Sequence, residues 1–532
     1  MTCTHLNGGL QIPVFRQKRW FRHCLCCGNE QPHNDTTFPE AAGSLAATGV
    51  AAMGSRNFQA ARDAFDKAAE NGGDPRCHLA SLLCSLGLTW CGNELHPTFT
   101  IDFPPRQRLQ DTAQWQQLAQ AADQLPPYVW QELDGLRTQL ESILTAMRED
   151  EGHSACDVFL CYRRSTRNRH SALSLFAPLR QKGLRVFCAD VTTRGKTQDQ
   201  FEAVVCHALR TAEYMVIFPG DGEEPVTPWM RNEFHRATCP AEKRFICSDG
   251  HQTTPAIEGT VLSLEKITQH LCSVAAECTS ARLIERAVTL LETGGSPVEA
   301  LHLLERASAR KSIAARLMLA TLWEEGVIVP ADAARAAHYR RLAGTPDAGV
   351  IQQVFTALQG IEAQRGIRHQ PALIYIAADV STAGLKHSRQ LLQQLMDALM
   401  TNRHLSSAEV CLVSYDRHAR LLQAPKPLDS YGAPADAAMK LTTDNTGGSD
   451  QQAYAAKGLR FCASHCNSTD AANAGQVPMV VLLSTGANDD PAEALAAAQA
   501  VAGAVFVNQR AATLTSAGDI PGCIAEMLRC LQ

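Results

Sequence analysis

The run Asp157-Val-Phe-Leu-Cys-Tyr-Arg-Arg164 is a short apolar segment that ends in polar and cationic residues, as buried strands of parallel sheets do. Amphipathic helical segments and further apolar runs alternate after it, a pattern typical of α/β folds. These segments are a helix with Leu173, Leu175, Phe176 and Leu179 on one side, a strand over 184–188, a polar loop over 190–196, a helix over 199–212 and a strand over 214–218. We therefore predict a parallel α/β unit over residues 153–275.

The polar residues of this unit gather at one predicted edge of the sheet. Arg163 ends the first strand, Asp190 follows the second, and the loop over 190–198 contains Gly195. In parallel α/β sheets, ligands bind beyond the carboxyl ends of the strands. We therefore expect the functional site of this unit to lie at that edge.

The unit that contains these residues resembles a known family, the TIR domain. TIR domains have a flavodoxin-like parallel sheet. The first strand has the family's Tyr-Arg-Arg ending, and Val186-Phe-Cys-Ala-Asp190 is similar to its second strand. The loop with Gly195 corresponds to the BB loop, and Pro228-Trp-Met-Arg-Asn-Glu-Phe234 to the Trp-x-x-x-Glu segment. The resemblance covers residues 153–275, with these pieces in the family's order and spacing.

The resemblance implies an activity, because many bacterial TIR domains cleave NAD⁺ with the glutamate of Trp-x-x-x-Glu as the catalytic residue. That glutamate is Glu233 in this sequence. Cleavage of the nicotinamide–ribose bond builds oxocarbenium character on the ribose, and a fixed carboxylate beneath the sugar stabilises that charge. We expect an NAD⁺ glycohydrolase that releases nicotinamide and ADP-ribose or a cyclic variant, with NAD⁺ as substrate and no cofactor required for catalysis.

The local sequence favours a helix that presents Glu233 correctly. Thr227 suits an N-cap, and Pro228 suits the first helical turn. Trp229 and Glu233 are then four residues apart and share one helix face. We expect the substrate-binding residues to be Trp229, Phe159, Arg163, Asp190 and Gly195.

A second function stays open. A Trp and a Glu four apart on a helix are ordinarily a packing anchor and a solvated charge, and some TIR domains are adaptors that associate through the BB loop. The alternative is therefore a non-catalytic scaffold that binds other proteins. For the enzyme, the family implies self-assembly through the TIR domain and a role in bacterial defence or cell suicide.

Helical segments flank the α/β unit over residues 41–150 and 276–365. In the first, Gly49, Phe58, Ala61, Phe65 and Ala68 resemble a tetratricopeptide repeat. The second resembles Sel-like repeats, since a pattern of small and large apolar residues recurs after 36 positions: Ala300, Leu303 and Ala307, then Ala336, Tyr339 and Ala343. Such repeats commonly present a partner surface, although a plain helical spacer is the alternative. We expect an unidentified protein partner.

A second α/β alternation follows over residues 368–532 and resembles a von Willebrand factor A domain, which has a Rossmann-like sheet. That family coordinates Mg²⁺ through a strand-end Asp-x-Ser-x-Ser, a distant Thr and a later Asp, all hard oxygen ligands. Asp379 and Ser381 are retained, and Ser449 stands in for the Thr. Ala383 and Thr485 replace the second Ser and the later Asp. We expect a crippled or empty magnesium site on a domain that still binds proteins.

The N-terminal residues 1–40 are predicted to be irregular, basic and Cys/His-bearing. Cys24 and Cys27 form a Cys-x-x-Cys pair followed by glycine, and Cys3 and His5 could complete a tetrahedral zinc site. Such a zinc would be structural. The alternative is a loose tail with incidental thiols.

Composition sets the remaining limits. The 532 residues suggest three to four domains, and 45% hydrophobic with 19% charged residues excludes a disordered chain. A net charge of −5 gives no general attraction to nucleic acid, and no apolar run is long enough for a membrane span. The 20 cysteines are scattered through apolar patterns, as buried free thiols are in a reducing compartment, so we expect a cytoplasmic location. The predicted fold class is multidomain α/β plus α.

Overall fold

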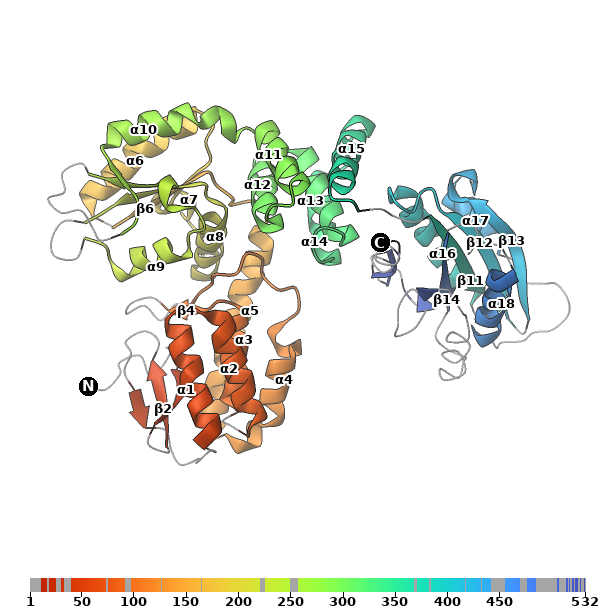
Figure 1. Cartoon of the computed structure of the whole chain (residues 1–532), viewed down its shortest axis with the longest axis horizontal. Helices are drawn as coiled ribbons and strands as arrows, with labels where there is room; N and C mark the ends of the chain where they lie inside the picture. The colour runs from red at the N-terminus through yellow and green to blue at the C-terminus, as the bar shows by residue number, and fades with distance from the viewer. Residues whose placement is uncertain are drawn as a thin grey trace. The chain divides into compact units, whose positions relative to one another are not determined.

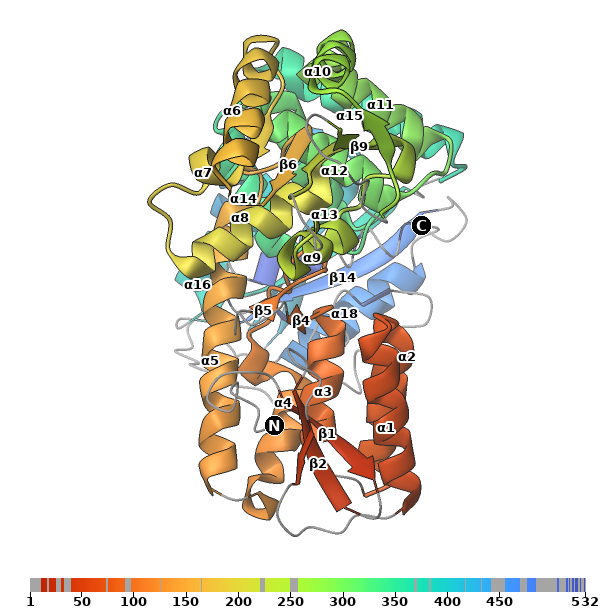
Figure 2. The ribbon, with the colours of Figure 1, turned by 90° about the vertical axis from the view of Figure 1, so that its left-hand side faces the viewer.

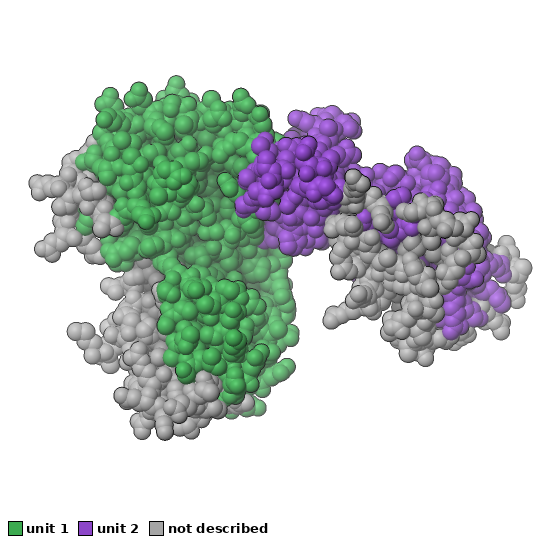
Figure 3. All heavy atoms as spheres, in the orientation of Figure 1, with its two compact units in different colours: residues 1–287, 298–312 green, residues 288–297, 313–532 purple. Residues whose placement is uncertain are grey.

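The computed structural model divides the chain into two compact units, residues 1–287 with 298–312 and residues 288–297 with 313–532 (Figure 3). Both units contain helices and a largely parallel sheet. The structure describes residues 11–16, 19–24, 30–32, 40–72, 75–90, 97–125, 127–163, 165–220, 225–248, 257–367, 371–381, 384–416, 418–431, 433–441, 455–468, 476–484, 505–506, 513–514, 516, 519–520, 522–524, 527 and 531.

The first unit contains a five-stranded parallel sheet in the order β10-β9-β8-β6-β7. Counted along the chain, this is the 2-1-3-4-5 order of flavodoxin-like folds. The strands are β6 (Val158–Tyr162), β7 (Val186–Cys188), β8 (Tyr214–Phe218), β9 (Arg244–Cys247) and β10 (Thr260–Leu262). The predicted parallel α/β sheet is therefore present, and β6, the first predicted strand of the unit, is an internal strand between β8 and β7.

Helices cover both faces of this sheet (Figure 1). They are α6 (Thr166–Gln181), α7 (Ala189–Thr192), α8 (Gln198–Thr211), α9 (Pro228–Arg236), η3 (Ala241–Lys243), α10 (Leu264–Ser273) and η4 (Ala275–Cys278). Alternate residues of β6 point to opposite faces of the sheet. Val158 and Leu160 pack with α6 and α10 on one face. Phe159 and Cys161 pack with α8 and α9 on the other. Helix α8 is buried on its far side too, because Ala203 and Cys206 belong to the core of the N-terminal helices.

The N-terminal helices form a bundle beside α8 (Figure 2). The elements are α1 (Glu40–Gly54), α2 (Phe58–Glu70), α3 (Arg76–Ser85), β4 (Thr89–Trp90), β5 (Pro97–Thr98), η1 (Leu109–Asp111), α4 (Ala113–Gln120), η2 (Ala122–Gln124) and α5 (Pro127–Asp150). A Cβ atom at Gly49 would lie 2.8 Å from the Phe65 ring. The pairing of a small residue with an aromatic one therefore lets α1 and α2 approach closely.

The expectation of irregular structure over 1–40 is wrong in part. Residues there form an antiparallel sheet of β1 (Gln11–Arg16), β2 (Arg19–Cys24) and β3 (Glu30–Pro32). Aromatic and β-branched residues favour strands, but basic residues interrupt the apolar pattern of both longer segments. Backbone pairing among the three neighbouring strands stabilises each of them, although the apolar pattern of a single segment is too weak to predict a strand.

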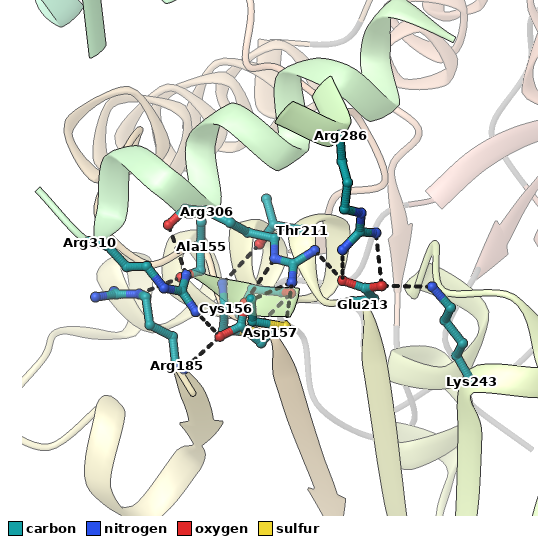
Figure 4. A network of polar contacts seen from close by, with 12 residues as sticks. Ala155, Cys156, Asp157, Arg185, Thr211, Glu213, Lys243, Arg286, Arg306 and Arg310 are labelled. Atoms are coloured by element: carbon teal, nitrogen blue, oxygen red, sulfur yellow. Dashed lines mark hydrogen bonds and ion pairs between the residues drawn. The ribbon is translucent and has the colours of Figure 1, made fainter. Parts of the chain in front are cut away.

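A network of buried charges ties a later helix to the amino-terminal edge of the parallel sheet (Figure 4). Asp157 accepts hydrogen bonds from Arg306 Nε at 2.9 Å and also pairs with Arg310. Glu213 pairs with Arg306 Nη1 at 2.7 Å and with Arg286 and Lys243. Because Asp157 precedes β6 and Glu213 precedes β8, helix α12 (Pro297–Ala309) and the residue after it close the edge of the sheet opposite to the strands' carboxyl ends.

In the second unit, α13 (Ile313–Glu325) packs on α14 (Ala333–Ala343) and α15 (Ala348–Gln364). Its sheet has the order β13-β12-β11-β14-β15, with β16 beside β14 and only β13 antiparallel. This matches the 3-2-1-4-5 order of Rossmann-like sheets. The remaining elements are α11 (Ser280–Glu292), which the division between the units crosses, and β11 (Ala372–Asp379), α16 (Leu385–Thr401), β12 (Glu409–Tyr415), β13 (Ala419–Pro427), η5 (Leu428–Tyr431), α17 (Pro434–Met439), α18 (Ala455–Ser468), β14 (Val477–Leu483), β15 (Val505–Phe506) and β16 (Thr513–Leu514).

Candidate functional site

The candidate site is built on α9, and its local sequence explains how the helix starts and packs. The Thr227 side chain accepts a hydrogen bond from Met230 N at 3.2 Å, and Pro228 occupies the first turn. Met230 and Phe234 are buried in the core beneath the sheet. The helix therefore begins where the sequence predicted and is fixed to the sheet by its apolar face.

Glu233 lies on this helix and is only 7% exposed. The indole of Trp229 donates a hydrogen bond from Nε1 to Glu233 Oε1 at 2.8 Å, as the shared helix face predicted. The Cys161 thiol of β6 is also a hydrogen-bond partner of this carboxyl group. Since Cys161 lies one residue before the carboxyl end of β6, an internal strand, the carboxylate stands near the edge where ligands bind in such sheets.

Burial dominates the electrostatics of this carboxylate. Removal from water disfavours the charged form and raises the pKa of Glu233 to about 7, although the hydrogen bonds from Cys161 and Trp229 act in the opposite direction. The Cys161 thiol is buried as well, and burial together with the neighbouring carboxylate raises its pKa well above the usual value. Near neutral pH, the site therefore holds a neutral thiol beside a carboxyl group that is close to half ionised.

The remaining predicted substrate residues take separate places. Arg163 is exposed just beyond β6, and its side chain lies against Gly220 beyond β8. Asp190 forms an ion pair with Arg169 at 2.9 Å, and its backbone N–H donates to Tyr162 Oη at 3.1 Å. The carboxyl ends of three adjacent strands thus bring Arg163 and Asp190 to one edge, as expected.

Two of the predicted residues differ in kind. Gly195 is exposed in the loop with a φ of +77°, a left-handed conformation that favours glycine. Phe159, expected to be a wall of the site, is instead fully buried and stacks on Phe187 with ring centroids 4.5 Å apart. Residues along a strand alternate between the two faces of a sheet, and Phe159 lies on the face that packs against α8 and α9. It is therefore a residue of that core.

Sequence reasoning missed two groups next to Glu233. Cys161 is part of the first predicted strand, and no motif marks it as the neighbour of a carboxylate. The second group is a fully buried ion pair between Arg236 of α9 and Glu202 of α8. Arg236 lies about one helical turn beyond Glu233, but only the fold shows which acid it meets.

The predicted magnesium residues of the second unit lie at the carboxyl end of β11. Asp379 is fully buried, its Oδ1 accepts from Ser381 N at 2.8 Å, and its Oδ2 has no hydrogen-bond partner among the described residues. Ser381 Oγ accepts from Gly384 N at 3.1 Å. A buried carboxylate oxygen without a partner suits a hard cation. Ser449, the third predicted ligand, lies outside the described residues, as do Ala383 and Thr485.

A second group of metal-type side chains lies elsewhere in this unit, where Glu325, Glu362 and His404 offer donor atoms within 4.8 Å of one another. Arg403 already neutralises the two carboxylates, with Nη2 at 2.8 Å from Glu325 Oε2 and Nη1 at 2.8 Å from Glu362 Oε2. Burial opposes protonation of His404, but hydrogen bonds to Glu325 and Glu362 raise its pKa. The group is therefore an ionic cluster in which positively charged protein side chains balance the two carboxylates.

The N-terminal zinc hypothesis falls outside the described part of the chain: Cys3, His5 and Cys27 are not described, and neither is the Cys24 side chain. The cysteines of the described core agree with their prediction. Cys84, Cys156, Cys188, Cys206 and Cys411 are all free and buried. None of the helices in the described residues combines the length and apolar character that a bilayer crossing requires.

Comparisons with known proteins place the chain in no family. No protein-family model matches it, and no curated protein does. Three solved structures that match are of proximal thread matrix protein 1 from the mussel byssus, one of them with a zinc-occupied MIDAS motif. The identities are 16%, 14% and 10%, with TM-scores of 0.22, 0.21 and 0.21. The alignments cover 31%, 31% and 71% of this chain and 49%, 48% and 96% of the others, so the chain spans about half the length of the first.

Proposed function

We propose that this chain is an NAD⁺ glycohydrolase in which Glu233 is the catalytic carboxylate. The observation that carries the proposal is a buried carboxylate, hydrogen-bonded to Trp229, beside the carboxyl end of β6, an internal strand of a flavodoxin-like sheet. The resemblance of residues 153–275 to TIR domains supports the same assignment. It also supports a role in bacterial defence, in which the flanking helical segments and the C-terminal α/β region control NAD⁺ loss through assembly of the chain.

The chemistry asked of Glu233 follows from the substrate. When the C1′–N bond breaks, its electron pair leaves with the nicotinamide, and the positive charge of the pyridinium passes to the ribose as an oxocarbenium ion. An ionised carboxylate stabilises that charge more strongly in a poorly solvated site than in water. Water then adds to C1′ and loses a proton, which gives ADP-ribose. The ionised form of Glu233 is the active one in this scheme.

Other residues of the unit orient the carboxylate or offer contacts to the substrate. The Trp229 indole fixes one oxygen through its N–H, and the ring lies 6.1 Å from the ring of Phe201 on α8. Arg163 and Asp190, at the carboxyl ends of β6 and β7, offer a cation and an anion for the phosphates and hydroxyls of a dinucleotide. These roles extend the proposal and depend on it.

The test measures nicotinamide release from NAD⁺ by the purified full chain, concentrated and crowded so that copies can assemble. We expect Glu233→Gln to lower the rate at least about 100-fold, because the lost charge acts directly on the transition state. The matched control is Glu242→Gln, which removes an exposed carboxylate of the same unit and should leave the rate unchanged.

A non-catalytic scaffold is the competing proposal, and one observation favours it. Val191, in the segment expected to be the BB loop, is 44% exposed, and an exposed apolar side chain suits a contact between proteins. If neither the parent nor Glu233→Gln releases nicotinamide under assembly conditions, the result contradicts the enzyme proposal and supports the scaffold. A Val191→Asp variant would then lose self-association while remaining folded.

A further inference from the structure

We propose that residues 98–102, here called the strap, together with the buried Arg236–Glu202 ion pair, position α9 and so set the direction of the Glu233 side chain. The inference rests on the proposed function where it names Glu233 as the acting carboxylate. The strap belongs to the N-terminal region, which no motif connects with the α/β unit.

The strap contacts α9 on both sides of Glu233. Asn232 Nδ2 donates to Thr98 Oγ1 at 3.1 Å, and Arg236 Nε donates to the carbonyl oxygen of Phe99 at 2.9 Å. Thr98 and Phe99 are fully buried. The residue before Glu233 and the residue three after it are therefore both held by the same short segment.

An ion pair fixes the strap in turn. The side chains of Arg236 and Glu202 are completely buried, and Glu202 Oε1 also accepts from Phe99 N at 3.2 Å. Both backbone polar groups of Phe99 are thus bound to the two members of one ion pair. At the far end of the strap, Arg210 Nε donates to Asp102 Oδ1 at 3.0 Å. Several hydrogen bonds and ion pairs therefore fix the position of the strap together, because each charged group orients its neighbour.

Helix geometry shows why these contacts govern direction. With 3.6 residues per turn, Met230 and Phe234 share one face of α9, Asn232 and Arg236 share another, and Glu233 lies between the two faces. The first face packs on the sheet through apolar contacts, which are not directional. Hydrogen bonds are directional, so the polar face sets the rotation of the helix about its axis and hence where Glu233 points.

The strap also links α9 to the N-terminal helices. Phe99 belongs to their core, and Thr100 Oγ1 donates to the carbonyl oxygen of Gly87 at 2.9 Å. A Cβ atom at Gly87 would meet the Thr100 hydroxyl at 2.0 Å, so this close approach needs glycine. A shift of the N-terminal helices would therefore move the strap and, through it, the candidate carboxylate.

The test compares three variants of the full chain: Thr98→Val, Arg236→Lys, and Thr268→Val as the matched control. Thr268 donates to a backbone carbonyl within α10 and does not contact α9. Thr98→Val removes the hydrogen bond from Asn232 Nδ2 and keeps nearly the same side-chain shape. Arg236→Lys keeps the charge but loses the planar fork that serves Phe99 and Glu202 together. Retained secondary structure by circular dichroism shows that each variant folds.

We expect Thr98→Val to lower kcat about threefold to tenfold with little change in KM, because the strap does not touch substrate. A loosened α9 hydrates Glu233, so the midpoint of kcat/KM against pH should move below that of the parent. The other ionisable groups around Glu233 are Cys161 on β6, Glu202 on α8 and Arg236 on α9, and Thr98→Val removes none of them. Arg236→Lys should have a larger effect on kcat.

Hydrogen exchange gives a readout that needs no activity. The backbone amides of 228–236 should exchange at least about threefold faster in Thr98→Val than in the parent or Thr268→Val. Equal exchange and equal kcat in Thr98→Val and the control would overturn the inference, and so would a fall in kcat with an unmoved pH midpoint. If the parent cleaves no NAD⁺, the proposed function fails, whereas faster exchange confined to α9 would still support the strap.

Discussion

At the scale of single residues, Glu233 and Trp229 form a pair whose chemistry depends on one hydrogen bond. The indole N–H favours the ionised carboxylate, whereas burial favours the protonated one. We predict that Trp229→Phe, which keeps an aromatic ring but removes the donor, raises the pKa of Glu233 further. The midpoint of kcat/KM against pH, expected near 7 in the parent, should move to higher pH.

This shift is opposite in sign to the one expected for the strap variant, so the two origins can be separated in one series of pH profiles. The control is Trp115→Phe, which changes a buried indole in the N-terminal core and should lower stability without moving the midpoint. A Trp229→Phe profile that coincides with that of the parent would show that the indole does not act on the carboxylate.

The same residues show how far sequence reasoning reaches. The N-cap Thr227, the first-turn Pro228 and the shared face of Trp229 and Glu233 all follow from spacing within one helix, and the structure has them. The partner Cys161 lies on a strand far back in the sequence, and no local period marks it. Pairings inside a helix are fixed by geometry that every helix shares, whereas pairings between elements depend on the whole fold.

At the scale of elements, His207 of α8 joins three helices of the first unit. Its Nδ1 lies 3.2 Å from Asp150 Oδ2 of α5, and its Nε2 lies 3.3 Å from Glu305 Oε2 of α12. Burial alone would lower the pKa of His207, but the two carboxylates outweigh it and raise the pKa to about 10. The buried, positively charged imidazole of His207 therefore links α5, α8 and α12 through ion pairs.

The sign of the pH dependence follows from this shift. Because the folded pKa lies above the unfolded value of 6.5, the stabilisation is complete below that pH and is lost as the pH rises toward about 10. We predict that His207→Gln lowers the thermal midpoint of the full chain by about 5 °C or more below pH 6.5. Calorimetry should show this difference shrinking as the pH is raised. The exposed His170→Gln is the control, and a difference that stays constant with pH would contradict the prediction.

Elements were easier to predict than the contacts among them. The strand over 214–218 has the predicted bounds, because a continuous apolar run of that length is typical of a parallel strand. The antiparallel strand β13 was missed, since its residues are half exposed and carry no such run. Its place in the sheet is set by pairing with β12, which no single segment reports.

At the scale of the whole molecule, the predicted α/β boundaries 153–275 leave out side chains on which the sheet depends. Arg286, Arg306 and Arg310 meet the acids Asp157 and Glu213. Burial alone would raise the pKa of Glu213, but Arg306, Arg286 and Lys243 hold it well below its usual range. A fragment that ends at 275 would keep both acids at the edge of the sheet and lose most of the cations that pair with them.

We therefore predict that residues 153–275 alone do not fold cooperatively, whereas residues 1–312 do. Removing the partners of a buried charge costs about 3–5 kcal/mol, and the net stability of a domain is only about 5–15 kcal/mol. The short fragment would lose this network and also the strap that binds Arg236 and Glu202, while the far side of α8 would be exposed at Ala203 and Cys206.

Near-ultraviolet circular dichroism and urea unfolding of the two fragments measure this difference, because both report tertiary packing rather than helix content. Fragment 1–312 should show one steep transition and, if it assembles, Glu233-dependent release of nicotinamide. Fragment 153–275 should show a weak aromatic signal and a broad change. A steep transition of 153–275 at the same urea concentration as that of 1–312 would mean that Arg306 and the strap add nothing to the sheet, and that the α/β unit folds within the boundaries drawn from its sequence.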